Sequence, residues 1–338
     1  MPINIKILPS GRNFPSKGNS SLLEAGLHAG LALGYGCSNG NCGECLAKII
    51  SGEVRKVRHH DYFISEEKRL TNHVLMCCHS AVTDVVLEAS EARNSTEIPQ
   101  QRITARVRNI EYVNNNVALL HLKTPRSNRL RFLAGQHVQL GGENMPTAKQ
   151  AISSCPCDDM NLHFQIPRLV NDAFSDHVFN QLNKGDRVNI EGPMGDFVLN
   201  ENSTHPMVFI AWHTGFAPIR SLIEHAMSLE LTQNMFLVWV APGMDDCYQD
   251  NLCRSWQDAF DNFHYLPVAK EDVAKKDVDE ENVDEEGIDK EGIDGNIIGG
   301  EAIIKLLNIN QNELSNYDFY ISSPKPCKNL PTARTFKF

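Results

Sequence analysis

The stretch that decides the fold of this chain is a glycine-rich and cysteine-rich run, Tyr35-Gly36-Cys37-Ser38-Asn39-Gly40-Asn41-Cys42-Gly43-Glu44-Cys45. A fourth cysteine, Cys77, follows after a long gap. Three thiols on one short loop require the backbone to wrap closely around whatever they bind. The glycines permit that approach and any positive φ angle it needs. The run therefore predicts a thiolate site formed by Cys37, Cys42, Cys45 and a cysteine of the distant Cys77-Cys78 pair.

The spacing of the cysteines indicates which group they bind. C-x4-C-x2-C with a distant fourth cysteine is the plant-type [2Fe-2S] signature. A zinc site is the alternative, but structural zinc sites normally show two paired-ligand motifs. The second half of this motif offers only the adjacent Cys77 and Cys78, which cannot easily both bind one tetrahedral ion. We therefore predict a [2Fe-2S] cluster, although spacing alone does not choose between Cys77 and Cys78.

Hydrophobic periodicity outlines a mixed α/β unit around this motif. Residues 3–8 alternate apolar and polar like a half-buried strand, and Ser21 with Glu24 has the spacing of a helix capping box. Further elements are expected at 22–30 (helix), 46–50 (strand), 65–70 (helix) and 84–89 (strand). The unit ends near residue 90.

The remaining chain divides by pattern into three parts. Residues 91–101 are polar, contain a proline and read as a linker. Short β-rich runs with Gly and Pro punctuation follow to about residue 200 and predict an antiparallel barrel. They lie at 105–110, 117–122, 137–140 and 162–166. From residue 207 a strand, a helix and a strand alternate, at 208–211, 219–227 and 235–240, which predicts a parallel sheet.

Charge is concentrated in one segment. The chain of 338 residues has a net charge of −10, and residues 271–295 contain twelve acidic residues and three lysines, a net of −9. The basic footprint of a nucleic-acid binder is missing. The acidic segment repeats every five residues and lacks the EF-hand glycine and glutamate, so we interpret 271–296 as a solvated insertion. With no apolar membrane span and no export signal, a cytoplasmic protein is expected.

Beyond the cluster motif, several ordered fragments are distinctive: Phe132-Leu133-Ala134-Gly135-Gln136, Ile152-Ser153-Ser154-Cys155-Pro156, Gly192-Pro193-Met194-Gly195-Asp196-Phe197, Thr214-Gly215-Phe216-Ala217-Pro218-Ile219, and Trp239 with Asp246-Cys247-Tyr248. Through these fragments residues 102–338 resemble the ferredoxin–NADP+ reductase superfamily. In its ferredoxin-first order the whole chain resembles the bacterial CDP-6-deoxy-glucoseen reductases, and next the reductases of aromatic-ring dioxygenases and of soluble methane monooxygenase.

The resemblance implies an α+β multidomain fold. It comprises a β-grasp [2Fe-2S] ferredoxin domain at 1–90, the linker at 91–101, an antiparallel β-barrel flavin-binding-type domain at 102–200, and an α/β parallel-sheet nicotinamide-binding-type domain at 201–338. The resemblance also implies Cys77 as the fourth cluster ligand, since Leu75 precedes it by two residues and Asp84 follows it by seven. Cys78 is then an ordinary buried residue.

Cofactor-binding positions also follow from the resemblance: Ile152, Ser153, Ser154, Thr214, Gly215, Pro218 and Ser322. Several family residues are nevertheless replaced in this chain. The flavin motif R-x-[YF]-[ST], which supplies a diphosphate arginine, a covering ring and a hydroxyl, reads Ala148, Gln150 and Ala151. In the phosphate loop, Asn171 and Asp172 stand where the family has Gly-Gly. Trp212 and His213 replace the first two glycines of the family's Gly-Gly-Thr-Gly, and Ser322 replaces the cysteine that lies by the nicotinamide. Cys155 and Cys157 are expected to be loop thiols.

Two functions are compatible with these residues. The one we expect is an electron-transfer oxidoreductase that passes electrons from NAD(P)H through FAD to the [2Fe-2S] cluster and on to an acceptor protein. The second is a non-catalytic paralogue, in which the ferredoxin domain relays electrons and the reductase half is a docking scaffold. A purely structural role is disfavoured, because it gives no reason for an intact four-cysteine motif. The expected partners are an acceptor protein and no nucleic acid, and the protein is expected to be monomeric.

Overall fold

The computed structural model describes residues 3–16, 18–269, 307, 309–323 and 333–336. The chain forms two compact units, each described by itself. The first contains residues 1–111, 118–199 and 220–231, and the second contains 112–117, 200–219 and 232–338. The acidic insertion predicted at 271–296 lies outside the described residues.

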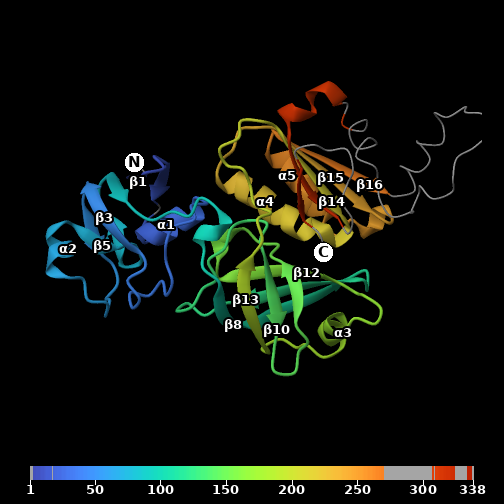
Figure 1. The fold of residues 1–338 in the computed structure, drawn as a ribbon, viewed down its shortest axis with the longest axis horizontal. Helices are drawn as coiled ribbons and strands as arrows, with labels where there is room; N and C mark the ends of the chain where they lie inside the picture. Colours follow the sequence, from blue (N-terminus) through green and yellow to red (C-terminus); the bar gives the residue numbers. More distant parts are fainter. Residues whose placement is uncertain (1–2, 17, 270–306, 308, 324–332, 337–338) are drawn as a thin grey trace, which may run out of the picture. The chain divides into compact units, whose positions relative to one another are not determined.

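A five-stranded sheet, a separate two-stranded sheet of β4 and β6, and two helices form the N-terminal part of the first unit (Figure 1). The strand order is β2-β1-β7-β3-β5, with β1 parallel to β7 and the other pairs antiparallel. The elements are β1 (Ile3–Leu8), β2 (Asn13–Ser16), α1 (Leu22–His28), β3 (Leu46–Ser51), β4 (Val54–Lys56), α2 (Glu66–Leu70), β5 (His73–Leu75), β6 (His79–Ala81) and β7 (Val85–Glu88). This mixed sheet with a crossing helix is the expected β-grasp arrangement.

Local sequence explains where the two helices begin. The Ser21 hydroxyl accepts a hydrogen bond from the Glu24 backbone N–H at 3.2 Å, which confirms the predicted cap of α1. Ser65 caps α2 in the same way through Lys68. Helix α1 buries Leu22, Leu23 and Leu27 in a core that also contains the inward residues of β1. The cap begins α1, and this apolar face packs it into the shared core of the domain.

The second sheet has six strands in the order β11-β10-β13-β8-β9-β12. Its elements are β8 (Gln101–Val113), β9 (Val117–Lys123), β10 (His137–Gly141), β11 (Ala148–Ala151), β12 (Asn161–Pro167), α3 (Ala173–Asn180) and β13 (Arg187–Met194). Immediately after β11, the Ser153 N–H donates to the His163 carbonyl in β12 at 2.8 Å. This bond joins the two edges of the sheet, so the structure confirms the expected antiparallel barrel, beside which α3 lies (Figure 1).

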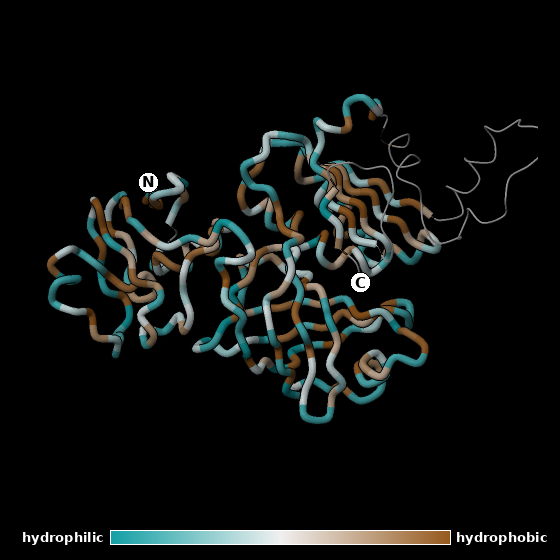
Figure 2. Tube along the Cα trace, viewed as in Figure 1, coloured by the Kyte–Doolittle hydropathy of each residue, from teal (hydrophilic) through white to brown (hydrophobic). Residues whose placement is uncertain are grey.

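The third sheet belongs to the second unit, and its described strands all pair in parallel, in the order β16-β15-β14-β17-β18. Its strands are β14 (Met207–Trp212), β15 (Met235–Ala241), β16 (Phe263–Ala269), β17 (Asp318–Ser322) and β18 (Arg334–Phe336), and α5 (Asp250–Ala259) belongs to the same unit. Helix α4 (Phe216–Ser228) follows β14; its residues up to 219 belong to the second unit and those from 220 to the first. Its inner strands are almost continuously apolar, as expected for strands buried on both faces, and Figure 2 shows them largely brown. The predicted fold class is confirmed.

Candidate functional site

The four cysteines predicted to bind the cluster come together in two pairs. Cys37 and Cys42 form one pair, in which the Cys42 N–H donates to Cys37 Sγ at 3.2 Å and the Cys37 N–H to Cys42 Sγ at 3.3 Å. Cys45 and Cys77 form the other, with 3.2 Å between their sulfurs. The first pair is half-buried and the second is buried. Two thiol pairs suit a two-iron cluster, in which four cysteines share two irons.

Glycines let the loop close around these thiols. A Cβ atom at Gly43, where φ is +85°, would lie 2.2 Å from the Tyr62 ring. A Cβ at Gly40, where φ is +92°, would lie 2.6 Å from His60 Cβ and 2.8 Å from Cys78 Sγ. Neither position has room for a side chain, and both have the positive φ that glycine tolerates. The predicted role of these glycines is therefore met by the packing.

Backbone N–H groups point at the thiols, as a ligand loop requires. Burial alone would raise the pKa of Cys37, but N–H groups of Asn39, Asn41 and Cys42 and the Cys42 thiol together hold it below its usual value. The hydrogen bond between the Cys45 and Cys77 thiols lowers the pKa of Cys45 to about 7 and raises that of Cys77. Cluster binding needs deprotonated thiols. Within each pair the pKa of one thiol is lowered, that of Cys37 and that of Cys45, while the pKa of its partner, Cys42 or Cys77, is raised. The residues present fit a [2Fe-2S] cluster.

Cys78 differs from its neighbour. Its sulfur lies 3.5 Å from Cys77 Sγ and points toward the His59 carbonyl at 3.9 Å, and burial raises its pKa. Cys77, by contrast, lies next to Cys45. This geometry supports Cys77 as the fourth ligand, in agreement with the resemblance.

A segment that the sequence did not single out covers the outside of the cysteine loop. Val57 and Arg58 donate backbone N–H groups to the Cys78 carbonyl at 2.9 and 3.3 Å. The Arg58 guanidinium donates to the Ser38 carbonyl at 2.7 Å, and the Tyr62 N–H donates to the Gly40 carbonyl. We name residues 57–62 the cover segment. No spacing rule links it to the cysteines, because its bonds are mostly to backbone carbonyls.

The predicted flavin positions Ile152, Ser153 and Ser154 are fully or almost fully buried in the barrel. The Ser153 hydroxyl accepts from the Gln165 amide at 2.9 Å, and Ser154 Oγ accepts from the His163 N–H at 3.2 Å. The Ser154 carbonyl accepts from the Ser221 hydroxyl at 2.7 Å. These bonds fix the chain after β11, so the two serines support the wall of the site.

The replaced flavin residues lie on and beyond β11. Ala148, Gln150 and Ala151 are half-buried on this strand, opposite β10. Asp172 is the N-cap of α3, and its carboxylate accepts from the Ser175 N–H at 2.7 Å. A carboxylate at this helix end satisfies the N–H that a phosphate would otherwise use and repels a second anion. The side chains at these positions do not fit a flavin diphosphate as the family's arginine and glycines do.

The nicotinamide-type positions surround the turn between β14 and α4. Thr214 and Gly215 form a single 3-10 turn, Pro218 lies in the first turn of α4, and Ser322 ends β17; all four are buried. At the start of this turn His213 has φ +44°, a conformation in which the family has glycine.

Aromatic side chains fill the space beside this turn. The Trp239 indole N–H donates to the His213 carbonyl at 3.0 Å. The Trp239 ring stacks on the Phe216 ring, with 4.0 Å between the ring centroids. Tyr248 contacts both His213 and Trp239 edge-on. Aromatic side chains therefore occupy the place where glycines would let a dinucleotide approach, and this turn does not reproduce the family's phosphate contacts.

Two further observations concern residues outside the site. Cys155 and Cys157 are joined by a disulfide, so the expectation of free loop thiols is wrong. The turn after Cys155 brings the two sulfurs together, which their spacing of two residues did not suggest. No helix in the described part of the chain is long and apolar enough to cross a membrane.

A cluster loop of this form, followed by a barrel and a parallel sheet, defines the class of electron-transfer iron–sulfur oxidoreductases. Residues 5–83 match the 2Fe-2S iron-sulfur cluster binding domain, 104–199 the oxidoreductase FAD-binding domain, and 209–302 the oxidoreductase NAD-binding domain. The chain belongs to the ferredoxin-first flavin reductases of the ferredoxin–NADP+ reductase superfamily, as the resemblance predicted. The family confirms the expected cofactor set of [2Fe-2S], FAD and NAD(P)H.

Individual relatives agree with this assignment. The CDP-6-deoxy-L-threo-D-glycero-4-hexulose-3-dehydrase reductase of Yersinia pseudotuberculosis is 32% identical over 272 residues, which cover 80% of this chain and 81% of the relative. Reductase component 1 of the terephthalate 1,2-dioxygenase of a Comamonas species is 27% identical over 267 residues, 79% of each chain. The solved structure of the Amycolatopsis cytochrome P450 reductase GcoB has the same fold, with a TM-score of 0.53, 22% identity, and coverage of 95% of this chain and 90% of that one.

Proposed function

We propose that Cys37, Cys42, Cys45 and Cys77 hold a [2Fe-2S] cluster that receives electrons originating from NAD(P)H and delivers them to an acceptor protein. The observation that carries the proposal is the pairing of these four thiols on a loop closed by Gly40 and Gly43. The two electrons of NAD(P)H would be passed on one at a time through bound FAD, which is chemistry that the cofactor supplies. The relatives named above are reductases of a dehydrase and of a dioxygenase, so the proposed acceptor is a redox enzyme component.

The roles of this chain's own residues follow from their contacts. The four cysteines bind the cluster, and the loop N–H groups stabilise their negative charge. Ser153 and Ser154 hold the barrel wall at the flavin-type site, and Thr214, Gly215, Pro218 and Ser322 line the nicotinamide-type turn. We further propose a cytoplasmic monomer with domains at 1–90, 102–200 and 201–338, joined after the first by a linker at 91–101.

The second candidate function, an electron relay with a non-catalytic reductase half, is favoured by one specific pair of observations. Asp172 caps the helix where the family binds phosphate, and His213 occupies the turn where the family has glycine. In this alternative the cluster exchanges electrons with other proteins, and neither FAD nor NAD(P)H takes part.

One experiment separates the two functions. The full chain is purified under anaerobic conditions, and its visible spectrum, iron, acid-labile sulfide and extractable flavin are measured before and after addition of NADH or NADPH. Bound FAD whose absorbance bleaches with either nucleotide, followed by loss of cluster absorbance, supports the oxidoreductase and overturns the relay. Iron and sulfide without FAD, and no response to either nucleotide, overturn the oxidoreductase. A protein without iron contradicts both.

A further inference from the structure

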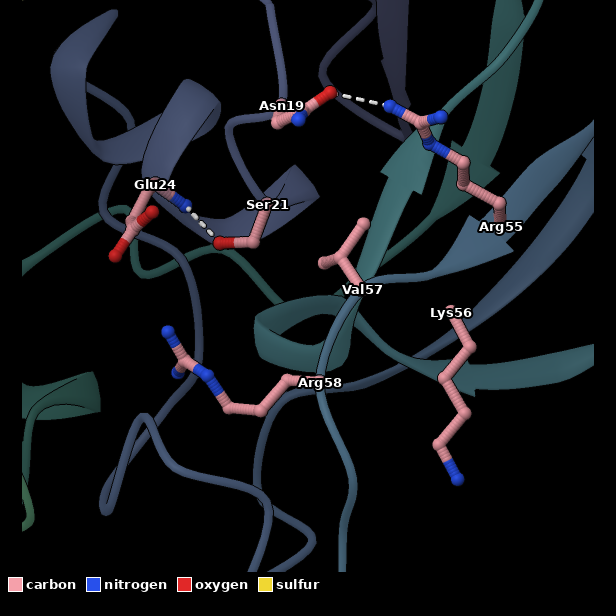
Figure 3. A pocket seen from close by; sticks show the side chains of 7 residues that line it. All are labelled: Asn19, Ser21, Glu24, Arg55, Lys56, Val57 and Arg58. Carbon is pink, nitrogen blue, oxygen red and sulfur yellow. Dashed lines mark hydrogen bonds between the residues drawn. The ribbon is translucent and has the colours of Figure 1, made fainter.

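A basic pocket lies on the ferredoxin domain beside the cysteine loop (Figure 3). It has a volume of about 400 Å³ and is lined by Asn19, Ser21, Glu24, Arg55, Lys56, Val57 and Arg58. Three of its side chains are cationic and exposed. Such a concentration of positive charge on a domain surface attracts anionic partners.

The arginines of this pocket bind uncharged acceptors and not carboxylates. Arg55 donates to the Asn19 side-chain oxygen and Arg58 to the Ser38 carbonyl, both uncharged acceptors. Glu24 is the pocket's one acidic lining residue, and its carboxylate lies 3.8 Å from the buried guanidinium of Arg129. Among the described residues, no carboxylate forms an ion pair with Arg55, Lys56 or Arg58. The pocket is therefore positively charged.

The pocket is connected directly to both ends of the cluster motif. Arg58 binds the carbonyl of Ser38, the residue after Cys37. The backbone of Val57 and Arg58 binds the carbonyl of Cys78, the residue after Cys77. Strand β4, which carries Arg55 and Lys56, pairs with β6, which begins at His79. A partner seated on this pocket would contact residues that are hydrogen-bonded to the neighbours of the proposed first and fourth ligands.

Apolar side chains accompany this charge. Val57 is 41% exposed within the pocket, and Phe63, directly after the cover segment, is 76% exposed with the Arg69 guanidinium over its ring at 5.6 Å. Arginines and aromatic rings together are typical of protein–protein interfaces. A small-molecule site would instead bury most of its ligand among convergent polar groups, whereas these cations lie in solvent.

We infer that this basic pocket, with the exposed Val57 among its cations, docks an acidic face of the protein that exchanges electrons with the cluster. The inference rests on the proposed function, since it concerns the acceptor of the same cluster. Exposed charges attract each other weakly and are screened by salt. The complex is therefore transient and salt-sensitive, as weak electron-transfer encounters of small interface area are.

The test uses the full chain reduced anaerobically with dithionite, so that neither FAD nor NAD(P)H is needed. It is mixed in a stopped-flow instrument with ferric cytochrome b5, an acidic one-electron acceptor, or with ferric cytochrome c, a basic one. In each reaction one electron leaves the protein and one ferric haem becomes ferrous. Arg55→Gln/Lys56→Gln/Arg58→Gln should slow the cytochrome b5 reaction about tenfold at low ionic strength. The difference should vanish in roughly 0.5 M salt.

Two variants keep this test decisive. Arg55→Gln/Lys56→Gln leaves the Arg58 bond to the cysteine loop in place and should show a smaller slowing of the same kind. Lys6→Gln/Arg108→Gln/Lys123→Gln removes the same charge from exposed strand positions outside the pocket and should leave the rate unchanged. An unchanged visible spectrum in every variant shows that the cluster is intact before any rate is compared.

A second readout does not depend on electron transfer. Carbodiimide coupling of the full chain to cytochrome b5 should join a partner carboxylate to Lys56, as mapped by mass spectrometry. Equal rates for the triple variant and the wild type, or a preference for cytochrome c that depends on the pocket, would overturn the inference. Binding of inorganic phosphate that is lost in the triple variant, with cytochrome b5 rates unchanged, would instead identify a small-anion site. A chain that lacks the cluster fails the proposed function before docking is measured.

Discussion

The phenolic hydroxyl of Tyr35 donates a 2.6 Å hydrogen bond to Oδ2 of Asp159, although 124 residues of chain separate them. Tyr35 lies two positions before Cys37, and Asp159 lies between β11 and β12 of the barrel. The Arg129 guanidinium donates to the other carboxylate oxygen at 3.1 Å, and all three side chains are at most 7% exposed. A buried, charge-assisted network therefore ties the start of the cysteine loop to the barrel within one compact unit.

Removing the Tyr35 hydroxyl should destabilise this unit. Tyr35→Phe deletes a buried hydrogen bond to a charged acceptor, and we expect a loss of about 1.5 to 3 kcal/mol in the free energy of unfolding. Urea denaturation followed by far-UV circular dichroism measures the change. Tyr317→Phe, on a half-buried ring of the second unit, is the matched control and should change the transition little. Identical midpoints for the two variants would show that the bond adds no stability.

Replacing each of the two adjacent cysteines by serine should give opposite results. Cys77→Ser removes a thiol that lies 3.2 Å from Cys45 Sγ, and we expect loss of the visible absorbance and of the electron paramagnetic resonance signal of the reduced cluster. Cys78→Ser alters a sulfur that points to the His59 carbonyl and should retain both signals. The reverse result would assign the fourth ligand to Cys78.

Packing at Gly43 should control cluster assembly. Gly43→Ala places a Cβ 2.2 Å from the Tyr62 ring in a positive-φ residue, so we expect iron and sulfide contents well below those of the wild type. Gly11→Ala is the control, because its φ is +76° but no atom lies within 4 Å. It should bear only the backbone penalty of about 1 to 2 kcal/mol and keep its cluster. Partial recovery of iron in Gly43→Ala/Tyr62→Ala would identify the ring as the obstacle.

Acid should destabilise the barrel through His163. Burial, then the nearby Arg220 and His121, lower the pKa of His163 to about 4 in the folded protein, against 6.5 for the unfolded chain. Between these values the unfolded chain binds more protons, so stability falls as the pH falls from about 6.5 toward 4. We expect about 1 to 2 kcal/mol less stability at pH 5 than at pH 7 from this group.

Urea midpoints across this pH range measure the effect, and His163→Gln should flatten the dependence. The exposed His59→Gln is the control, and its pH dependence should follow the wild type. A His163→Gln variant with the full wild-type slope would assign the acid sensitivity to other groups, such as His137, whose pKa burial also lowers to about 4.

Neutralising the α3 cap should strengthen flavin binding. Asp172→Asn keeps an N-cap side chain that can accept from the Ser175 N–H but removes the negative charge at the helix end. The helix N-terminus then attracts a diphosphate without a competing carboxylate, and we expect FAD affinity to rise several-fold. Quenching of flavin fluorescence on titration measures it, with Glu111→Gln as a charge-matched control. Unchanged affinity would place the flavin diphosphate away from α3.

Much of the fold follows from local sequence. The cysteine run, the Ser21 cap and the unbroken apolar strands β14 and β15 all act through neighbours along the chain or through a single periodicity. Strand β11, with the sequence Ala148-Lys149-Gln150-Ala151, has no β-branched or aromatic residue and exists because β10 pairs with it. Strand β13 contains Gly192-Pro193, which reads as a turn. Both segments become strands because they pair with neighbouring strands, and the pattern of residues along the chain does not show that pairing.

The candidate site shows the same division. The ligand cysteines have a fixed spacing, so they could be predicted as a set. The contact of Tyr35 with Asp159 and that of Arg58 with Ser38 join distant segments through long side chains. No sequence spacing encodes either contact. The disulfide between Cys155 and Cys157 was missed for a different reason, since a separation of two residues does not by itself indicate that two sulfurs meet.

The Asp172 cap has a consequence for how the protein matures. A helix whose first turn is completed by its own carboxylate does not need a nucleotide in order to form. A flavin bound to the folded barrel would add stability by mass action, but the helix does not depend on it. Helix α3 can therefore form before a flavin arrives, so loading with the cofactor can follow the folding of this element.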